Sequence, residues 1–147
     1  MESPEKLGKG DIISSLVIGE ICAWLIMAMA QAVLNPESYT KFSPIVKLMP
    51  VLFPIVCIVG LYVAYLISKK VPIIYQIAKF VLVGGFNTLV DWGVLSYLLV
   101  LNSPGSTWLS VFSLTIIYYY LYKTISFVLA ATNSYLWNKF WTFKRET

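Results

Sequence analysis

An amide and an acid lie one helical turn apart in a segment that is otherwise apolar enough to sit in lipid. The segment reads KFVLVGGFNTLVDW and contains Asn87 and Asp91. An ionised carboxylate near the centre of a membrane helix costs roughly 2.5–3.5 kcal/mol on insertion scales. Asp91 therefore predicts a polar partner on a neighbouring helix or a role in handling a polar ligand.

A second segment, SFVLAATNSYLWNKFWTF, carries a comparable set of polar side chains further along the chain. Residues three or four positions apart share one face of a helix, so each segment presents a polar face. Because successive spans run antiparallel, the two faces are expected to meet as a polar seam. The residues predicted to bind a ligand along this seam are Asn87, Thr88, Asp91, Lys123, Asn133, Ser134, Trp137 and Asn138.

The chemistry of this set suits hydroxyl groups and phosphates. Amides both donate and accept hydrogen bonds, and a lysine neutralises an anion. Lys123 is expected near the outer end of the last span, from which its stem reaches inward to Asp91. Trp92 and Trp137 offer aromatic faces on which a sugar can stack. For the asparagines, simple adhesion between helices is the alternative, since such hydrogen bonds are common in membrane proteins.

The amino-acid composition indicates a membrane protein. The 147 residues are 59% hydrophobic and 12% charged, and the mean hydropathy is +0.76. Apolar runs fill most of the chain, which predicts a single membrane domain over residues 1–147 with no separate catalytic domain. Without histidine, a nucleotide-binding motif or an acidic metal cluster, we expect neither enzymatic activity nor a cofactor. The basic residues form no helical face of their own, which argues against nucleic acid as a partner.

Four apolar runs predict an all-α, polytopic membrane fold. A crossing needs about 20 apolar residues, and the last run is long enough to hold a short interfacial or re-entrant helix before its span. Residues 1–11 are interpreted as a retained tail rather than a signal peptide. The predicted spans are 12–34, 45–67, 77–101 and 119–141, with the short helix at 108–117.

The distribution of basic residues predicts the orientation. Lysine and arginine accumulate on the cytoplasmic side of membrane proteins, and here one set of span ends carries most of them. Lys41 and Lys47 flank the opposite ends. Both termini are therefore expected to be cytoplasmic. The cytoplasmic set is Lys6, Lys9, Lys69, Lys70, Lys79, Lys139, Lys144 and Arg145.

Several residues of the first two spans are assigned mainly structural roles. Cys22 and Cys57 lack a CxxC pattern, so they are expected to be small buried side chains rather than metal or redox sites. Pro50 and Pro54 are expected to bend the second span. Glu20 either has a function, extends its carboxylate to the membrane interface, or pairs with a cytoplasmic-side lysine. Small residues recur every four positions in three spans, which permits close helix packing and dimerisation.

The two polar segments together resemble the GtrA-like family, small prokaryotic membrane proteins of about four spans associated with cell-surface polysaccharide synthesis. The resemblance covers residues 76–145. An apolar hairpin precedes it here, whereas the family commonly carries its glycine-rich motif near the N-terminus, so no family role is carried over to residues 1–70. The matching residues are Phe80, Gly84, Gly85, Asn87, Thr88, Asp91, Asn138, Lys139, Trp141, Thr142 and Phe143.

The resemblance implies the handling of polyprenyl-phosphate-linked sugars in a prokaryotic cytoplasmic membrane. The first hypothesis is a translocator, in which the seam passes the sugar while Lys79, Lys123 or Lys139 neutralises the phosphate. The second is a non-catalytic scaffold or regulatory subunit that docks a glycosyltransferase through its cytoplasmic basic residues. The third is a small proton-coupled exporter that depends on Glu20. Membrane lipid, a lipid-linked sugar, a glycosyltransferase and a second copy of the chain are the partners considered.

Overall fold

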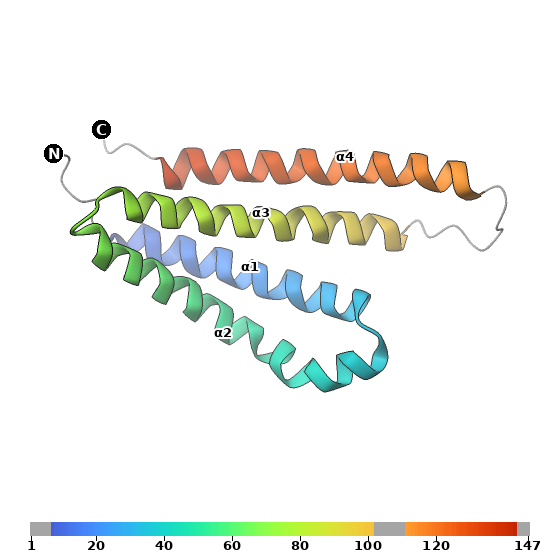
Figure 1. Cartoon of the computed structure of the whole chain (residues 1–147), viewed down its shortest axis with the longest axis horizontal. Helices are drawn as coiled ribbons and strands as arrows, with labels where there is room; N and C mark the ends of the chain where they lie inside the picture. Colours follow the sequence, from blue (N-terminus) through green and yellow to red (C-terminus); the bar gives the residue numbers. More distant parts are fainter. Residues whose placement is uncertain (1–6, 102–110, 144–147) are drawn as a thin grey trace.

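A computed structural model describes residues 7–101 and 111–143, and it is all-α as expected. Three of its helices, α1, α2 and α3, are long and apolar enough to cross a membrane. A fourth helix, α4, lies beside α3 (Figure 1). The chain is therefore a polytopic membrane protein. The elements are α1 (Lys9–Val33), α2 (Pro36–Ser68), α3 (Ile73–Leu101), α4 (Val111–Trp137) and a π-helix, η1 (Asn138–Thr142).

Helix α3 is the centre of the arrangement. It packs against α1, α2 and α4, whereas α4 packs against α3 on the side away from the α1–α2 hairpin (Figure 1). The two described ends of the chain lie at the same end of the molecule as the turn between α2 and α3 (Figure 1). This placement agrees with an even number of crossings. We call this end of the molecule the terminal end.

Helix α2 is longer than predicted and is bent. Asn35 caps its start, because the Asn35 side-chain oxygen accepts a hydrogen bond of 2.8 Å from the Ser38 backbone N–H, and Pro36 fits the first helical turn. The helix also contains Pro44, Pro50 and Pro54. Each internal proline removes one backbone hydrogen bond, and α2 bends in its N-terminal half (Figure 1).

The short interfacial helix expected at 108–117 is not a separate element where the structure describes it. Residues 111–117 form the first turns of α4, which continues without interruption to Trp137. Neither proline nor glycine occurs between residues 111 and 137, so nothing interrupts the helical hydrogen bonds. Residues 108–110 lie outside the described part of the chain. At 1.5 Å per residue α4 is about 40 Å long, which exceeds the hydrocarbon core of about 30 Å.

Helices α1 and α2 make the closest backbone contact of the hairpin at Gly19. A Cβ atom at this position would lie 2.6 Å from the Cα of Pro54, so only glycine permits this approach. Ser15 and Ala23, one turn to either side, are fully buried. The small residues of α1 therefore do pack a neighbouring helix. By contrast, a Cβ atom at Gly84 or Gly85 would meet no atom within 4 Å.

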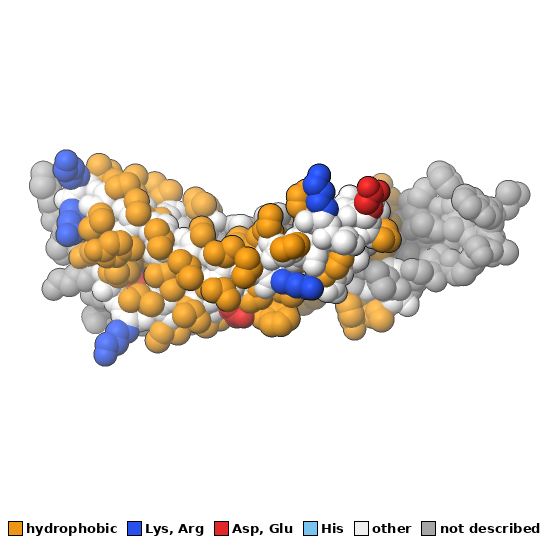
Figure 2. Space-filling model, turned by 90° about the horizontal axis from the view of Figure 1, so that it is seen from below, with side chains coloured by type: hydrophobic (Ala, Val, Ile, Leu, Met, Phe, Trp, Pro, Cys, Tyr) orange, Lys and Arg blue, Asp and Glu red, His pale blue; other side chains and the backbone are white. Residues whose placement is uncertain are grey.

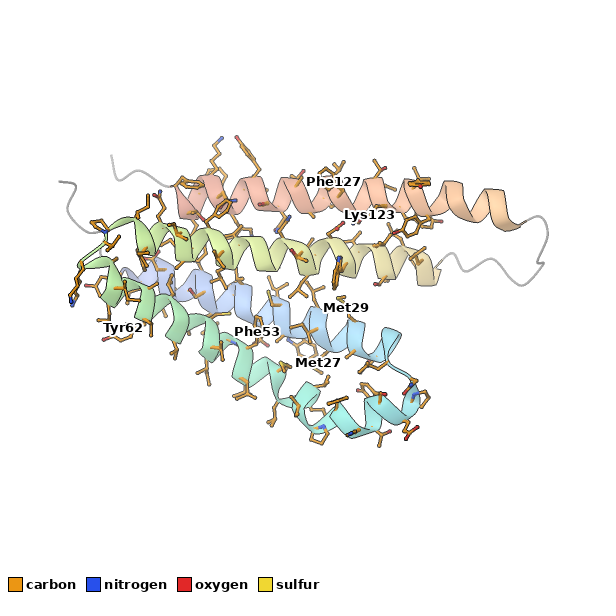
Figure 3. All side chains as sticks on the ribbon, in the orientation of Figure 1. Met27, Met29, Phe53, Tyr62, Lys123 and Phe127 are labelled. Carbon is orange, nitrogen blue, oxygen red and sulfur yellow. The ribbon has the colours of Figure 1, made fainter. Side chains whose placement is uncertain are left out.

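The surface between the two ends is largely apolar (Figure 2). Side chains such as Val56, Val81 and Phe127 are more than 60% exposed, which is expected where lipid rather than water surrounds the protein. Figure 3 shows Tyr62 pointing outward from α2. Cys22 and Cys57 are buried and unpaired, as predicted.

Candidate functional site between α3 and α4

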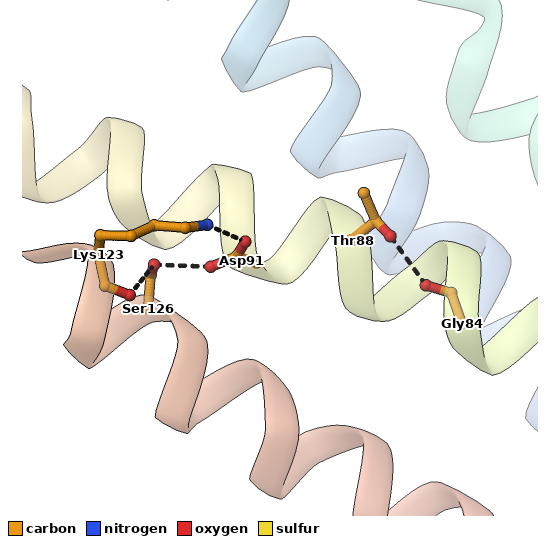
Figure 4. A network of polar contacts seen from close by, with 5 residues as sticks. All are labelled: Gly84, Thr88, Asp91, Lys123 and Ser126. Carbon is orange, nitrogen blue, oxygen red and sulfur yellow. Dashed lines mark hydrogen bonds and ion pairs between the residues drawn. The ribbon is translucent and has the colours of Figure 1, made fainter.

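Asp91 of α3 pairs with Lys123 of α4, which confirms the predicted contact. The Lys123 ammonium contacts Asp91 Oδ2, and Figure 3 shows Lys123 on the side of α4 that faces α3. The Ser126 hydroxyl donates a hydrogen bond of 2.7 Å to Asp91 Oδ1 (Figure 4). Both carboxylate oxygens of Asp91 are thus occupied by groups of α4. Ser126 is the first residue of the second polar segment, whose polar face was expected to meet that of the first.

An open groove lies along the same helix pair, nearer the terminal end. Its volume is about 540 Å³, within the range of small-molecule sites. Its lining combines amides, a hydroxyl and a lysine with aromatic rings, so it offers both polar and apolar contacts. The lining residues are Asn87, Ala131, Ser134, Tyr135, Asn138, Lys139 and Phe143.

The amide groups at this seam have unused hydrogen-bonding capacity within the described part of the chain. Asn138 Nδ2 donates to the Ser134 hydroxyl over 3.2 Å, but Asn138 Oδ1 is buried without a partner. Asn87 Oδ1 and Asn133 Nδ2 are likewise buried and unpartnered. A buried polar atom without a partner costs about 1–3 kcal/mol. Asn87 and Asn138 also line the groove, so their unpartnered atoms lie beneath its surface.

Lys139 supplies positive charge at the groove. Its side chain is exposed, and its ammonium lies 5.4 Å from the centre of the Tyr135 ring and 5.5 Å from that of Phe140. Tyr135 also lines the groove. The cation therefore stands over aromatic surface, where it can neutralise an anionic group.

Five of the predicted site residues do not line the groove. Thr88 is exposed, and its hydroxyl donates to the Gly84 carbonyl of its own helix over 3.1 Å. Trp137 turns into the core, where its ring contacts those of Phe86 and Trp141 edge-on, at centroid distances of 6.2 and 6.0 Å. Asp91 and Lys123 are also absent from the groove lining, and Figure 4 shows their ion pair farther along α3 than Thr88. Asn133 is half-buried on α4 but is not part of the groove lining.

A second ion pair is buried at the terminal end. Lys79 is 1% exposed, and its ammonium lies 2.8 Å from Asp11 Oδ1 and 4.5 Å from the centre of the Tyr75 ring. The same carboxylate oxygen accepts a hydrogen bond of 2.9 Å from the Trp141 indole N–H. Asp11 Oδ2 accepts a hydrogen bond of 2.9 Å from the Gly8 backbone N–H. Lys79 therefore pairs with a carboxylate of the protein itself. From the sequence, Lys79 was instead considered as a lysine that neutralises the phosphate of the ligand.

The sequence analysis missed the role of Asp11 and the aromatic lining of the groove. Asp11 stands at the start of the first apolar run, where an acid can serve as a simple helix-terminus charge. No ligand contact was predicted for Tyr135 or Phe143, because aromatic residues near span ends usually mark the membrane interface. The one feature of the sequence that indicated a polar site at this end of the groove was the pair of Asn138 and Lys139 at the end of the last span.

Glu20 lies apart from the groove. Its carboxylate Oε1 accepts a hydrogen bond of 2.8 Å from the Trp24 indole N–H, one turn along α1. Trp24 is 56% exposed. The predicted pairing of Glu20 with a lysine is thus replaced by a contact within α1.

Comparisons with known proteins give one match. Neither the curated proteins nor the solved structures yielded a match to the chain. The model of the family described as GtrA/DPMS, transmembrane domain, matches residues 79–147, close to the extent expected from the sequence motifs. This range includes α4, the π-helix, most of α3 and every residue that lines the groove. The family consists of membrane proteins of glycan and lipid-linked sugar processes. The chain therefore carries a GtrA-like transmembrane domain over residues 79–147.

Proposed function

We propose that the protein translocates polyprenyl-phosphate-linked sugars across the cytoplasmic membrane for the synthesis of cell-surface polysaccharide or glycan. The supporting observation is the groove between α3 and α4, in which buried amide atoms without partners accompany an exposed lysine. The sugar hydroxyls take the hydrogen bonds that Asn87 and Asn138 leave open. The phosphate lies near Lys139, at the terminal end, while the polyprenyl tail stays in lipid.

The residues farther along the seam have a different part in this proposal. The Asp91–Lys123 pair and Ser126 hold α4 against α3. Asn133 offers one more unpartnered amide nitrogen along the route of the headgroup. No chemical step on the sugar is involved, so the protein acts as a non-catalytic carrier.

Translocation can be measured with purified protein in liposomes that contain a fluorescent polyprenyl-phosphohexose. Quenching from outside reports the fraction of headgroups that change leaflet. We expect Asn138→Ala and Asn87→Ala each to slow translocation about tenfold, since a hydrogen bond in a dry site contributes on the order of 1.4 kcal/mol.

Thr132→Ala is the matched control. The Thr132 hydroxyl donates to the Val128 carbonyl of its own helix over 2.8 Å, and the residue is exposed outside the groove. This variant should translocate at the parent rate. Equal rates for Thr132→Ala and both groove variants, all folded, would contradict the proposal.

A membrane subunit for a glycosyltransferase is the second candidate. The observation that favours it is the open space at Gly84 and Gly85 on α3, because small residues allow a helix of another protein to approach closely. This candidate predicts no translocation by the purified protein and co-purification of a glycosyltransferase. Replacing Gly84 by leucine would then abolish the co-purification.

A further inference from the structure

The groove ends in an unusual backbone turn. Residues 138–142 form a π-helix, in which the Phe143 N–H donates to the Asn138 carbonyl over 2.8 Å. A single π-helical turn at the end of an α-helix is rare and is frequently found at functional sites. Here the turn carries two groove residues, Asn138 and Lys139, and it ends at a third, Phe143. The register of this turn therefore decides how these side chains face the groove.

The opposite side of the same turn is anchored in the protein interior. Trp141 is 8% exposed and belongs to the core, and its indole N–H donates to Asp11. Asp11 belongs to α1, in the hairpin that precedes the matched domain. Its carboxylate is fixed in turn by Lys79 and by the Gly8 backbone N–H. Each polar contact of Asp11 is thus made to a group whose own position is restrained.

We propose that Asp11 is a positioning residue for the groove, which acts through Trp141. The hydrogen bond from the indole holds the π-turn in one register, and that register presents Asn138 and Lys139 to the ligand. The α1–α2 hairpin thereby completes a binding site whose lining residues all belong to the GtrA-like domain. This inference rests on the proposed function, because the ligand positioned is the phosphate-linked sugar.

Trp141→Phe tests the inference most directly, because it removes the indole N–H and keeps an aromatic ring in the core. Trp24→Phe is the matched control, since it also removes an indole-to-carboxylate hydrogen bond from the α1 helix, away from the groove. Asp11→Asn is a third variant, which keeps an oxygen acceptor for Trp141 but removes the charge that pairs with Lys79.

Two ligands separate positioning from a general loss of structure. Binding of a fluorescent polyprenyl-phosphohexose and of the same polyprenol without phosphate or sugar is measured in detergent micelles. We expect Trp141→Phe to weaken binding of the phosphohexose about tenfold and to leave binding of the polyprenol unchanged. Asp11→Asn should weaken phosphohexose binding less than Trp141→Phe does, and Trp24→Phe should match the parent for both ligands.

A ligand-free measurement reports the position of the turn. The rings of Phe80 and Phe143 lie 6.2 Å apart. In a protein with Cys22 and Cys57 replaced by alanine, thiols placed by Phe80→Cys and Phe143→Cys should therefore be linked readily by a short bis-maleimide reagent. Adding Trp141→Phe should slow this cross-link several-fold, and adding Trp24→Phe should not change it.

The outcomes distinguish the two proposals. A parent protein that binds the phosphohexose no better than the polyprenol contradicts the proposed function, and the positioning role falls with it. A parent that prefers the phosphohexose, with Trp141→Phe equal to Trp24→Phe, overturns only the role of Asp11 and Trp141. The positioning role is also overturned if Trp141→Phe weakens binding of both ligands equally, or if it leaves the rate of the cross-link unchanged. In either case the π-turn would not determine how the groove residues are presented.

Discussion

At the scale of single residues, the protein separates two kinds of buried polar group. The carboxylate oxygens of Asp91 are occupied by donors from α4, and those of Asp11 by Lys79, Trp141 and the nearby Gly8 backbone N–H. The groove asparagines, Asn87 and Asn138, each keep an oxygen without a partner in the described structure. Charges in a membrane domain are stable when they are paired, whereas an amide oxygen without a partner keeps its capacity to accept a hydrogen bond. The acids therefore hold helices together, and the amides are the better candidates for binding.

The Asp91–Lys123 pair should stabilise the contact between α3 and α4. In a double-mutant cycle with Asp91→Asn and Lys123→Met, we expect a coupling free energy of about 0.5–3 kcal/mol. Lys123→Met alone should be the more damaging change, because it leaves the Asp91 carboxylate charged and without its cation. The free energy of unfolding in mixed micelles measures both effects. Lys47→Met, an exposed lysine of α2, is the control, and strictly additive effects of the two seam changes would contradict the pairing.

At the scale of elements, helix packing depends on where side chains are absent. The α1–α2 contact at Gly19 and Pro54 leaves no space for a Cβ atom. On α3, Gly84 and Gly85 face open space instead, so the same residue type has different consequences on the two helices. At the C-terminal end of α4, the π-helix η1 places Lys139 on the surface and Trp141 in the interior.

Alanine substitutions should expose this difference between the glycines. Gly19→Ala should lower the free energy of unfolding by about 1–3 kcal/mol, because the added methyl group overpacks the interface with the Pro54 backbone. Gly84→Ala should be neutral or stabilising by up to about 1 kcal/mol, since alanine is the better helix former and meets no atom. Unfolding in a denaturing detergent titration would compare the two. Equal destabilisation by both variants would show that the α1–α2 approach is not as close as described.

At the scale of the whole molecule, α3 connects the α1–α2 hairpin to α4, and of these two parts only α4 lies within the range that the family model matches. The α1–α2 hairpin lies outside the matched range, yet it packs on α3 and reaches the π-turn through Asp11. The two described ends and the α2–α3 turn share the terminal end, where Lys69, Lys70 and Lys139 also lie. This basic end is the one that we expect to face the cytoplasm.

Cysteine labelling in intact cells would test this orientation. With Cys22 and Cys57 replaced by alanine, a thiol introduced by Glu37→Cys in the first turn of α2 should react with a membrane-impermeant maleimide. A thiol introduced by Lys70→Cys in the α2–α3 turn should react only after the cells are permeabilised. Both positions are exposed, so access to the reagent depends on the side of the membrane. Labelling at position 70 in intact cells would reverse the proposed topology.

The sequence by itself determined the helical membrane fold and the ion pair of Asp91 with Lys123. Long apolar runs have few alternatives to the helix, because lipid offers no hydrogen bonds to the backbone. The contact between Asp91 and Lys123 was predictable, since they are the charged residues of two antiparallel spans that lie away from the cytoplasmic span ends, which leaves few ways to bury both. The bend of α2 followed from its prolines, and the extent of the GtrA-like region followed from its motifs.

Only the tertiary structure decided which faces of the helices meet. Apolar residues surround these helices on nearly every side, so periodicity gives little information about rotation about the helix axis. For that reason the sequence did not show that Trp137 turns into the core, that Tyr135 and Phe143 line the groove, or that α4 begins before its span. The contact of Asp11 with Trp141 joins residues 130 positions apart. Such a contact depends on the relative offset and rotation of α1, α3 and the π-turn, and these are fixed only when all the helices pack together.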